Sequence, residues 1–270
     1  MTEAQITPTQ RVQQWLDGFN ETLQSDNPGQ AAELFEHDGF WRDLVAMTWN
    51  IKTMEGHENI RDMLEHTTGQ ARPDNWKVAE EATEQDGVTE AWITFETKDA
   101  LGKGHVRLRD GAAWTLLTTM QELKEFPEKR NFLRPKGARH GATKSRKTWL
   151  EALLEEEQEL GYSRQPYCVI IGGGQGGIGL AARLRQLDVP TIAIERNPKA
   201  GDSWRNRYKS LCLHDPVWYD HMPYLPFPDH WPVFAPKDKI GDWLEMYTKI
   251  MELNYWSSTE CTGARYDETS

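Results

Sequence analysis

A glycine-rich turn at residues 172–177 constrains the fold of this chain more than any other segment of its sequence. Gly172, Gly174 and Gly177 have the spacing G-x-G-x-x-G. In that pattern the first glycine allows a tight turn, the second lets a pyrophosphate approach the backbone, and the third lets the next helix pack on the preceding strand. Residues 167–171 are apolar and rich in β-branched side chains, which predicts a strand buried on both faces before the turn.

The segments after the turn complete a strand–helix–strand unit. Residues 178–187 predict an amphipathic helix, whose free N–H groups and positive dipole end face the turn, where an anion would lie. Residues 191–194 predict a second strand that ends at Glu195, close to the spacing at which a carboxylate binds a ribose hydroxyl. An ordinary glycine-rich turn is the alternative interpretation, but the strand and helix around it favour a dinucleotide site.

Length, charge and cysteine content limit the number of domains and the classes of protein to which the chain can belong. A chain of 270 residues predicts two domains, and a net charge of −11 gives no reason to expect nucleic-acid binding. Cys168, Cys212 and Cys261 are odd in number and far apart, which favours reduced thiols over disulfides or a metal site. Without a membrane-length apolar stretch or a signal-peptide core, the sequence predicts a cytoplasmic protein that does not bind membranes.

Residues 1–123 predict a separate α+β domain. One helical face carries apolar residues at positions 12, 15, 16, 19 and 23, and two more helices are expected at residues 27–35 and 56–68. Four β-prone segments follow, with hairpin turns expected at residues 85–87 and 109–111: residues 76–83, 88–97, 104–109 and 112–121. Helices followed by antiparallel strands are an α+β pattern.

The segment "AELFEHDGFWRDLVAMTWNIKTMEGHENIRDML" at residues 32–64 resembles the cone-shaped α+β barrels of nuclear transport factor two, ketosteroid isomerase and the SnoaL-like polyketide cyclases. The resemblance covers most of residues 8–122. That family includes enzymes, binding modules and dimerisation domains, so a homodimer through this domain is one expectation. The residues expected to fill the cone are Trp41, Trp49, Trp92 and Trp114. Five polar residues are candidates for a pocket that performs general-base catalysis: His37, Asp38, Arg42, Asp43 and His105. The alternative is that they are ordinary surface, helix-cap or pocket-lining groups.

Residues 124–165 are expected to join the two domains. Residues 124–147 hold nine Lys and Arg against two Asp and Glu, which favours a solvated connector over an anion site. Residues 148–162 predict an apolar-striped helix that ends near Gly161 and braces the two domains.

Residues 166–270 resemble the flavin-containing monooxygenases and their relatives among plant auxin-synthesis and Baeyer–Villiger enzymes. The matching motifs are the G-x-x-W of residues 201–204, then "RYKS", "PFPDHWPVF" and "DWLEMYTKIMEL". The resemblance implies an incomplete α/β Rossmann-like FAD-binding domain. It also implies that the chain is the front part of a longer enzyme and is inactive alone, because the family's second nucleotide domain for NADPH or NADH is missing.

Glu195 by itself suits the ribose of FAD or of NAD, and the adjacent Arg196 would suit a 2′-phosphate; the resemblance favours FAD. It places Ser203 and Trp204 at the flavin end, and His214 and Asp215 where many relatives carry Asn–Ser. The residues expected to bind the cofactor are Gly172, Gly174, Gln175, Gly176, Gly177, Glu195, Arg196, Ser203, Trp204, His214 and Asp215.

The implied activity is oxygenation of a small molecule. In the family, NAD(P)H reduces FAD, reduced flavin captures O₂ as a C4a-hydroperoxide, and one oxygen atom passes to a soft nucleophile or a carbonyl carbon. The sequence assigns no catalytic residue and no metal ligand. The alternative hypothesis is a non-catalytic protein in which the first domain dimerises and the glycine turn only holds nucleotide.

Overall fold

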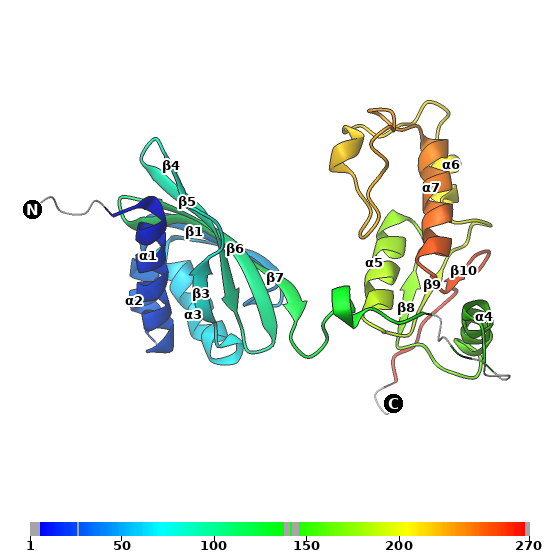
Figure 1. Ribbon diagram of the computed structural model, residues 1–270, viewed down its shortest axis with the longest axis horizontal. Helices are drawn as coiled ribbons and strands as arrows, with labels where there is room; N and C mark the ends of the chain where they lie inside the picture. The colour runs from blue at the N-terminus through cyan, green and yellow to red at the C-terminus, as the bar shows by residue number, and fades with distance from the viewer. Residues whose placement is uncertain (1–5, 26, 138–140, 142–145, 268–270) are drawn as a thin grey trace, which may run out of the picture. The chain divides into compact units, whose positions relative to one another are not determined.

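The computed structural model describes residues 6–25, 27–137, 141 and 146–267 (Figure 1). The chain divides into two compact units, Met1–Pro127 and Glu128–Ser270. Both units combine helices with a β-sheet, so the mixed α and β character expected from the sequence is present in each.

The first unit places three helices against one large sheet (Figure 1). Its strands run in the order β2-β1-β7-β6-β5-β3, with β4 paired to β5, and every pairing is antiparallel except β1 with β7. The helices are α1 Pro8–Gln24, α2 Pro28–Glu33 and α3 Gly56–Ala71. The strands are β1 Phe35–Leu44, β2 Ile51–Glu55, β3 Asp74–Val78, β4 Thr83–Gln85, β5 Val88–Glu96, β6 Ala100–Arg109 and β7 Ala112–Leu123.

The local signals for α1 and for the two hairpins are confirmed. Helix α1 begins with a capping box between Thr7 and Gln10, and the expected apolar face is buried. Both hairpin turns have two central residues with positive φ, Asp86–Gly87 and Asp110–Gly111, as a type I′ turn requires. These turns set Gln85 opposite Val88 and Arg109 opposite Ala112.

The expectation of one continuous strand over residues 76–83 is wrong. The Ala79 N–H still donates to the Trp92 carbonyl oxygen at 2.8 Å, but residues 80–82 leave the ladder, so strands β3 and β4 pair separately with the two ends of β5. Glu80 and Glu81 lie in this break and are exposed, while the Ala82 N–H donates to Thr9 Oγ1 instead of to a strand. A bulge of this kind keeps acidic side chains in water and bends the sheet edge.

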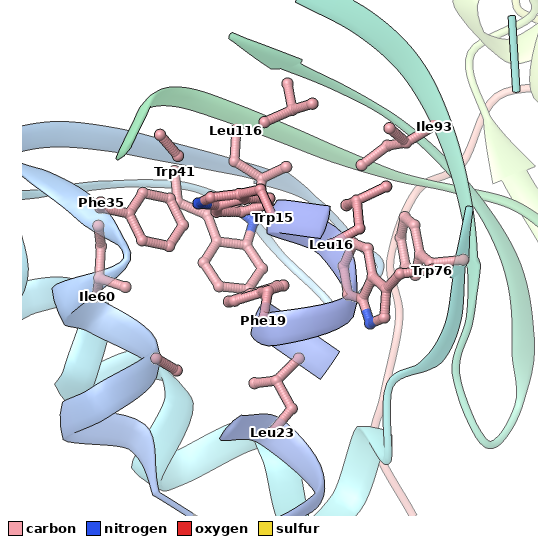
Figure 2. Packing of buried hydrophobic residues seen from close by; sticks show 14 of the residues in the cluster. Trp15, Leu16, Phe19, Leu23, Phe35, Trp41, Ile60, Trp76, Ile93 and Leu116 are labelled. Atoms are coloured by element: carbon pink, nitrogen blue, oxygen red, sulfur yellow. The ribbon is translucent and has the colours of Figure 1, made fainter. Parts of the chain in front are cut away.

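The core of the first unit is an aromatic cluster between the helices and the sheet (Figure 2). Phe19 lies at its centre, with ring centroids of Trp15, Trp41 and Trp76 at 5.0, 5.6 and 5.3 Å. Such stacked and edge-to-face pairs contribute about 0.5–1.5 kcal/mol each beyond the burial of their apolar area.

Of the four tryptophans expected to fill this core, only Trp41 does so. Trp49 is 60% exposed and Trp92 is 41% exposed. Trp114 is half-buried, with the Arg109 guanidinium 4.7 Å from its ring centroid. Successive residues of a strand point to opposite faces, so Trp92 and Trp114 lie on the face of the sheet away from the helices.

The second unit contains a three-stranded parallel sheet of order β10-β9-β8. Helix α5 packs on β8 and β9, while α7 packs on α5 and α6. Ile178, Ile240 and Leu244 are part of the buried apolar cluster that these elements share. The strands are β8 Cys168–Ile171, β9 Thr191–Ile194 and β10 Tyr255–Trp256. The helices are α4 Trp149–Glu159, α5 Gln175–Gln186, α6 Asp202–Arg205 and α7 Lys237–Ile250, with 3₁₀ turns η1 Asn131–Leu133 and η2 Val217–Tyr219.

Strand β8 is not buried on both faces, contrary to the expectation from its composition. Ile170 is 8% exposed beneath α5, but Val169 and Ile171 are 50% and 66% exposed. Strand β8 is the last strand on its side of the described sheet, and only one of its faces is covered by helix α5. The apolar run therefore predicted the strand correctly, but it did not predict that one face of the strand is exposed.

Helix α4 forms where the apolar stripe predicts it, with a capping box between Thr148 and Glu151. None of its residues is buried, and Trp149, Leu150 and Leu154 are exposed. Its hydrogen bonds to the rest of the second unit include those of Glu156 with Arg185 and of Trp149 with Glu252, both at 2.6 Å. The expectation that α4 braces the two domains stays a prediction.

Candidate nucleotide-binding site

The three motif glycines occupy positions that require glycine for different physical reasons. Gly172 has φ +107°, in the region that side chains disfavour. A Cβ at Gly177 would collide with the Gly172 carbonyl oxygen, so this glycine allows α5 to pack on the end of β8. A Cβ at Gly174 would meet nothing closer than Ser203 Oγ at 3.8 Å. The space beside Gly174 is therefore open, as the approach of a phosphate to the backbone demands.

The N-terminus of α5 faces this open space without a side-chain cap. Gly174 is the N-cap residue, and no side chain accepts a hydrogen bond from the first turn. The first turn contains Gln175 and Gly176, which are both exposed. Uncapped N–H groups and the positive end of the helix dipole together favour an anion at this position.

Ser203 supplies a second polar group beside Gly174. Its Oγ is buried and has no hydrogen-bond partner among the described residues. A buried hydroxyl without a partner costs about 1–3 kcal/mol, which a bound oxygen acceptor would recover. The hydroxyl and the N-terminus of α5 are thus suited to the same anion.

Glu195 lies just beyond the end of β9 and is buried, with 7% of its surface exposed. Its Oε2 accepts the Gly173 N–H at 2.9 Å, and its Oε1 accepts the backbone and side-chain N–H groups of Asn197 at 2.8 and 2.7 Å. Oε2 keeps a free lone pair for a ligand hydroxyl, because a carboxylate oxygen accepts two hydrogen bonds. Arg196 is exposed, and within the described part of the chain it forms no ion pair with Glu195.

Asn197 and Tyr255 complete the turn, and sequence reasoning missed both. The Tyr255 hydroxyl donates to the Gly173 carbonyl oxygen at 2.8 Å. Burial, together with the nearby charges of Glu195 and Asp202, raises the pKa of Tyr255, so it remains a neutral donor. Asn197 could have been suspected from its place two residues after Glu195, whereas Tyr255 reaches the turn only through the pairing of β10 with β9.

The G-x-x-W segment forms α6 and turns Trp204 toward the first turn of α5. Trp204 Nε1 donates to Gln175 Oε1 at 2.9 Å. Gly201 has φ +86°, and a Cβ there would collide with the backbone of Gly241 in α7. Arg205 fastens α6 to α7 through ion pairs of 2.8 and 2.9 Å with Asp242 and Glu245.

A hollow of about 490 Å³ opens beside Gln175 and Trp204. It brings together four of the residues expected from the sequence, because His214 and Asp215 also line it. Ser203, Glu195 and the motif glycines are not among its lining residues. The polar residues that sequence reasoning did not include are Arg207, Cys212, Asp220 and His221. Gln175, in the first turn of α5, lines the hollow, so the hollow lies next to the glycine turn.

The five general-base candidates of the first unit do not come together in one pocket. His37 and Asp38 are exposed. Asp43 is fully buried and accepts hydrogen bonds from the Met47 and Thr48 amides and from the Thr48 and Thr118 hydroxyls. Asp43 is therefore a structural carboxylate that closes the loop between β1 and β2.

The other two candidates, Arg42 and His105, lie on the opposite face of the sheet from this buried network. They line a surface hollow there. No helix in the described residues is long and apolar enough to cross a membrane. No group of three or more His, Cys, Asp or Glu among them could hold a metal ion.

Comparison with known proteins gives a partial match. No protein-family model matches the chain. The chain is 36% identical over 103 residues to a probable indole-3-pyruvate monooxygenase of Arabidopsis thaliana, YUCCA9, and the match covers 38% of this chain and 24% of that protein. The chain spans about a quarter of the length of the curated relatives it matches. Part of this chain is therefore similar to flavin monooxygenases.

Two solved structures are similar to parts of the chain. A flavin monooxygenase of Stenotrophomonas maltophilia, solved as a double mutant, is 24% identical with a TM-score of 0.30, covering 33% of this chain and 27% of that one. A protein of Cytophaga hutchinsonii described as NTF2-like and of unknown function is 15% identical with a TM-score of 0.29, covering 44% of this chain and 95% of that one.

Proposed function

We propose that the second unit is a Rossmann-like unit that holds FAD, as part of an NAD(P)H-dependent flavin monooxygenase. The observation that carries the proposal is the uncapped N-terminus of α5, which faces the open space at Gly174 and the unpaired Ser203 hydroxyl. A pyrophosphate satisfies both groups at once. The similarity to indole-3-pyruvate monooxygenases supports the choice of FAD over other dinucleotides.

Each part of the site has a role in this proposal. The α5 N–H groups and Ser203 bind the pyrophosphate, and Glu195 accepts a hydrogen bond from the adenosine ribose. The hollow beside Trp204 takes the isoalloxazine ring, with His214 and Asp215 at its polar edge. Asn197 and the Gly173 amide hold the Glu195 carboxylate in position. Arg196 has no contact in this arrangement.

The bound flavin would supply the redox chemistry, the transfer of electrons from a nicotinamide nucleotide to O₂. The protein's own contribution is to orient the dinucleotide and to shield its ring end with the apolar wall of the hollow, formed by Leu211, Phe227 and Leu244. The substrate is a small molecule, and the names of the relatives make an apolar oxo acid a reasonable first compound to assay.

The test is an equilibrium titration of the full chain with FAD, FMN and ADP, followed by FAD fluorescence or calorimetry. The proposal predicts saturable FAD binding and at least tenfold weaker binding of FMN, which lacks the adenosine half. Gly174→Val should weaken FAD binding at least tenfold by filling the phosphate approach. Gly18→Val is the matched control, because a Cβ at that helix position meets nothing within 4 Å.

Two results would contradict this function. If the chain binds ADP as tightly as FAD, the site holds only the nucleotide half, and the alternative of a nucleotide-binding protein without flavin chemistry is favoured. If Gly174→Val leaves FAD affinity unchanged, the cofactor does not use this turn.

A further inference from the structure

We propose that the outer face of the first unit's sheet carries a binding site for a small aromatic carboxylate, with Arg42 as its counter-ion. This site lies in the first unit, and nothing in the proposed nucleotide site depends on it. The argument rests on strand register, on a surface hollow and on the distribution of charge.

Strand register places a continuous row of side chains across five neighbouring strands. Arg42 on β1 is the cross-strand partner of Thr53 on β2 and of Leu117 on β7. Leu117 is opposite His105 on β6, which is opposite Trp92 on β5. Cross-strand partners point to the same face of a sheet. The residues that follow or precede them, such as Trp41 and Leu116, point into the core on the other face.

A second row runs beside the first, two residues away along each strand. Its members are Phe40, Thr115, Arg107 and Glu90. The two rows enclose a hollow of about 500 Å³ on the sheet surface. The residues that line it are Phe40, Arg42, Thr53, Trp92, His105, Arg107, Thr115, Leu116 and Leu117. Apolar and aromatic groups therefore alternate with cationic groups on one surface.

The cations of this face differ in whether they already have a partner. Arg107 pairs with Glu90 at 2.8 Å, and Lys103 lies 3.9 Å from Glu80 and covers the Trp92 ring at 4.5 Å. Arg42 donates only to the Thr53 hydroxyl, at 3.2 Å, and within the described residues it forms no ion pair. Its guanidinium is therefore available to an external anion.

His105 adds a neutral hydrogen-bonding group to the hollow. Its ring lies edge-on to Trp92, with centroids 4.8 Å apart and an interplanar angle of 67°. Partial burial lowers the pKa of His105 against the opposing charge of Glu90, so the ring is uncharged at neutral pH. Among the described residues that line it, the hollow therefore offers one free cation and one neutral hydrogen-bonding group.

This charge distribution selects the class of ligand. A single guanidinium matches the two oxygens of a carboxylate. A di- or triphosphate needs more free cations than the described lining of this hollow offers, and Glu90 would repel it. The apolar groups Phe40, Leu117 and Trp92 suit a flat apolar body of one or two rings.

The proposal is tested by titrating the full chain with 2-naphthoate and with its uncharged analogue 2-naphthamide. Binding is followed by the indole N–H resonance of Trp92, assigned by its loss in Trp92→Phe. We expect a saturable shift with naphthoate and at least about tenfold weaker binding of the amide. Arg42→Gln should weaken naphthoate binding by a similar factor, and Arg42→Lys should restore part of it.

Arg61→Gln is the matched control for Arg42→Gln. Arg61 lies on α3, half exposed, in an ion pair of 3.8 Å with Glu65, so its loss removes one positive charge from the same unit without touching the hollow. It should leave the affinity for naphthoate unchanged.

The proposal is overturned if naphthoate and naphthamide bind equally, if Arg42→Gln has no effect, or if the Trp92 resonance does not move. It is also overturned if sedimentation equilibrium shows a dimer that Arg42→Gln dissociates and naphthoate does not. In that case the occupant of this face is a second copy of the chain.

Discussion

The two sheets of this molecule differ in how much of each is covered. In the first unit, three helices bury one face of the sheet, and Phe19, Phe35 and Trp41 are at most 2% exposed. In the second unit, strand β8 leaves Val169 and Ile171 half exposed or more. The first unit thus covers one face of its sheet with buried aromatic rings, whereas strand β8 of the second unit has a largely exposed face. The second unit has a buried apolar cluster of its own, around Ile178, Leu244 and Tyr247.

The largest expected effect on stability comes from comparing a buried residue of the first unit with an exposed residue of the second unit. Phe19→Ala should lower the free energy of unfolding of the first unit by about 3–5 kcal/mol, because it leaves a cavity among four aromatic rings. Ile171→Ser should change the stability of the second unit by less than about 0.5 kcal/mol, since that side chain is already exposed. Urea unfolding followed by circular dichroism measures both. A larger loss from Ile171→Ser would contradict the comparison.

The buried carboxylate of the first unit gives the next effect. Asp43→Ala should destabilise this unit by about 2–4 kcal/mol, because it leaves two amides and two hydroxyls without their acceptor. Asp38→Ala, at an exposed position, is the control and should be neutral within about 0.5 kcal/mol. Equal effects of the two variants would show that Asp43 is not the structural residue described above.

A backbone position tests the second unit in the same way. Gly201→Ala should cost about 1–3 kcal/mol, because Gly201 has φ +86° and a Cβ would collide with Gly241. Gly263→Ala, with nothing within 4 Å, should be close to neutral. Thermal unfolding of both variants measures the difference, and no difference would mean that α6 and α7 can separate at little cost.

Tyrosine ionisation at alkaline pH should affect only the second unit, because all eight tyrosines lie beyond residue 127. Burial raises the pKa of Tyr247 to about 12 and also raises that of Tyr255. A pKa raised by folding gives stability that is complete below the unfolded value near 10 and is lost as pH rises toward the folded value. We expect a loss of about 1–2 kcal/mol for Tyr247 between pH 10 and 12.

Unfolding measured at several alkaline pH values checks this, with phenolate absorbance reporting ionisation. In Tyr247→Phe the pH dependence should be weaker. If the phenolate of Tyr247 forms in the folded protein near pH 10, the assignment is wrong.

Sequence reasoning succeeded where the determinants are local. The type I′ hairpins follow from Asp–Gly pairs, helix α1 from its apolar period and cap, and the approach of Glu195 to the glycine turn from a short strand–helix–strand unit. It failed where the answer depends on what packs from afar. The aromatic side chains of Trp92 and Trp114 suggest core residues, but the strand register places both on the outer face of the sheet. Tyr255 contacts Gly173 because β10 pairs with β9. The exposure of β8 depends on its neighbours in space, which its own residues do not encode.

The central proposal is that FAD binds the glycine turn of the second unit. The most direct test is the urea unfolding of the full chain with and without FAD, with the NMR resonances of the tyrosine rings reporting the second unit. At a free FAD concentration about 100 times its Kd, the second unit should gain about 2.7 kcal/mol, the first unit should gain nothing, and Gly174→Val should abolish the gain. Equal stabilisation of both units, or a gain that survives Gly174→Val, would contradict the account.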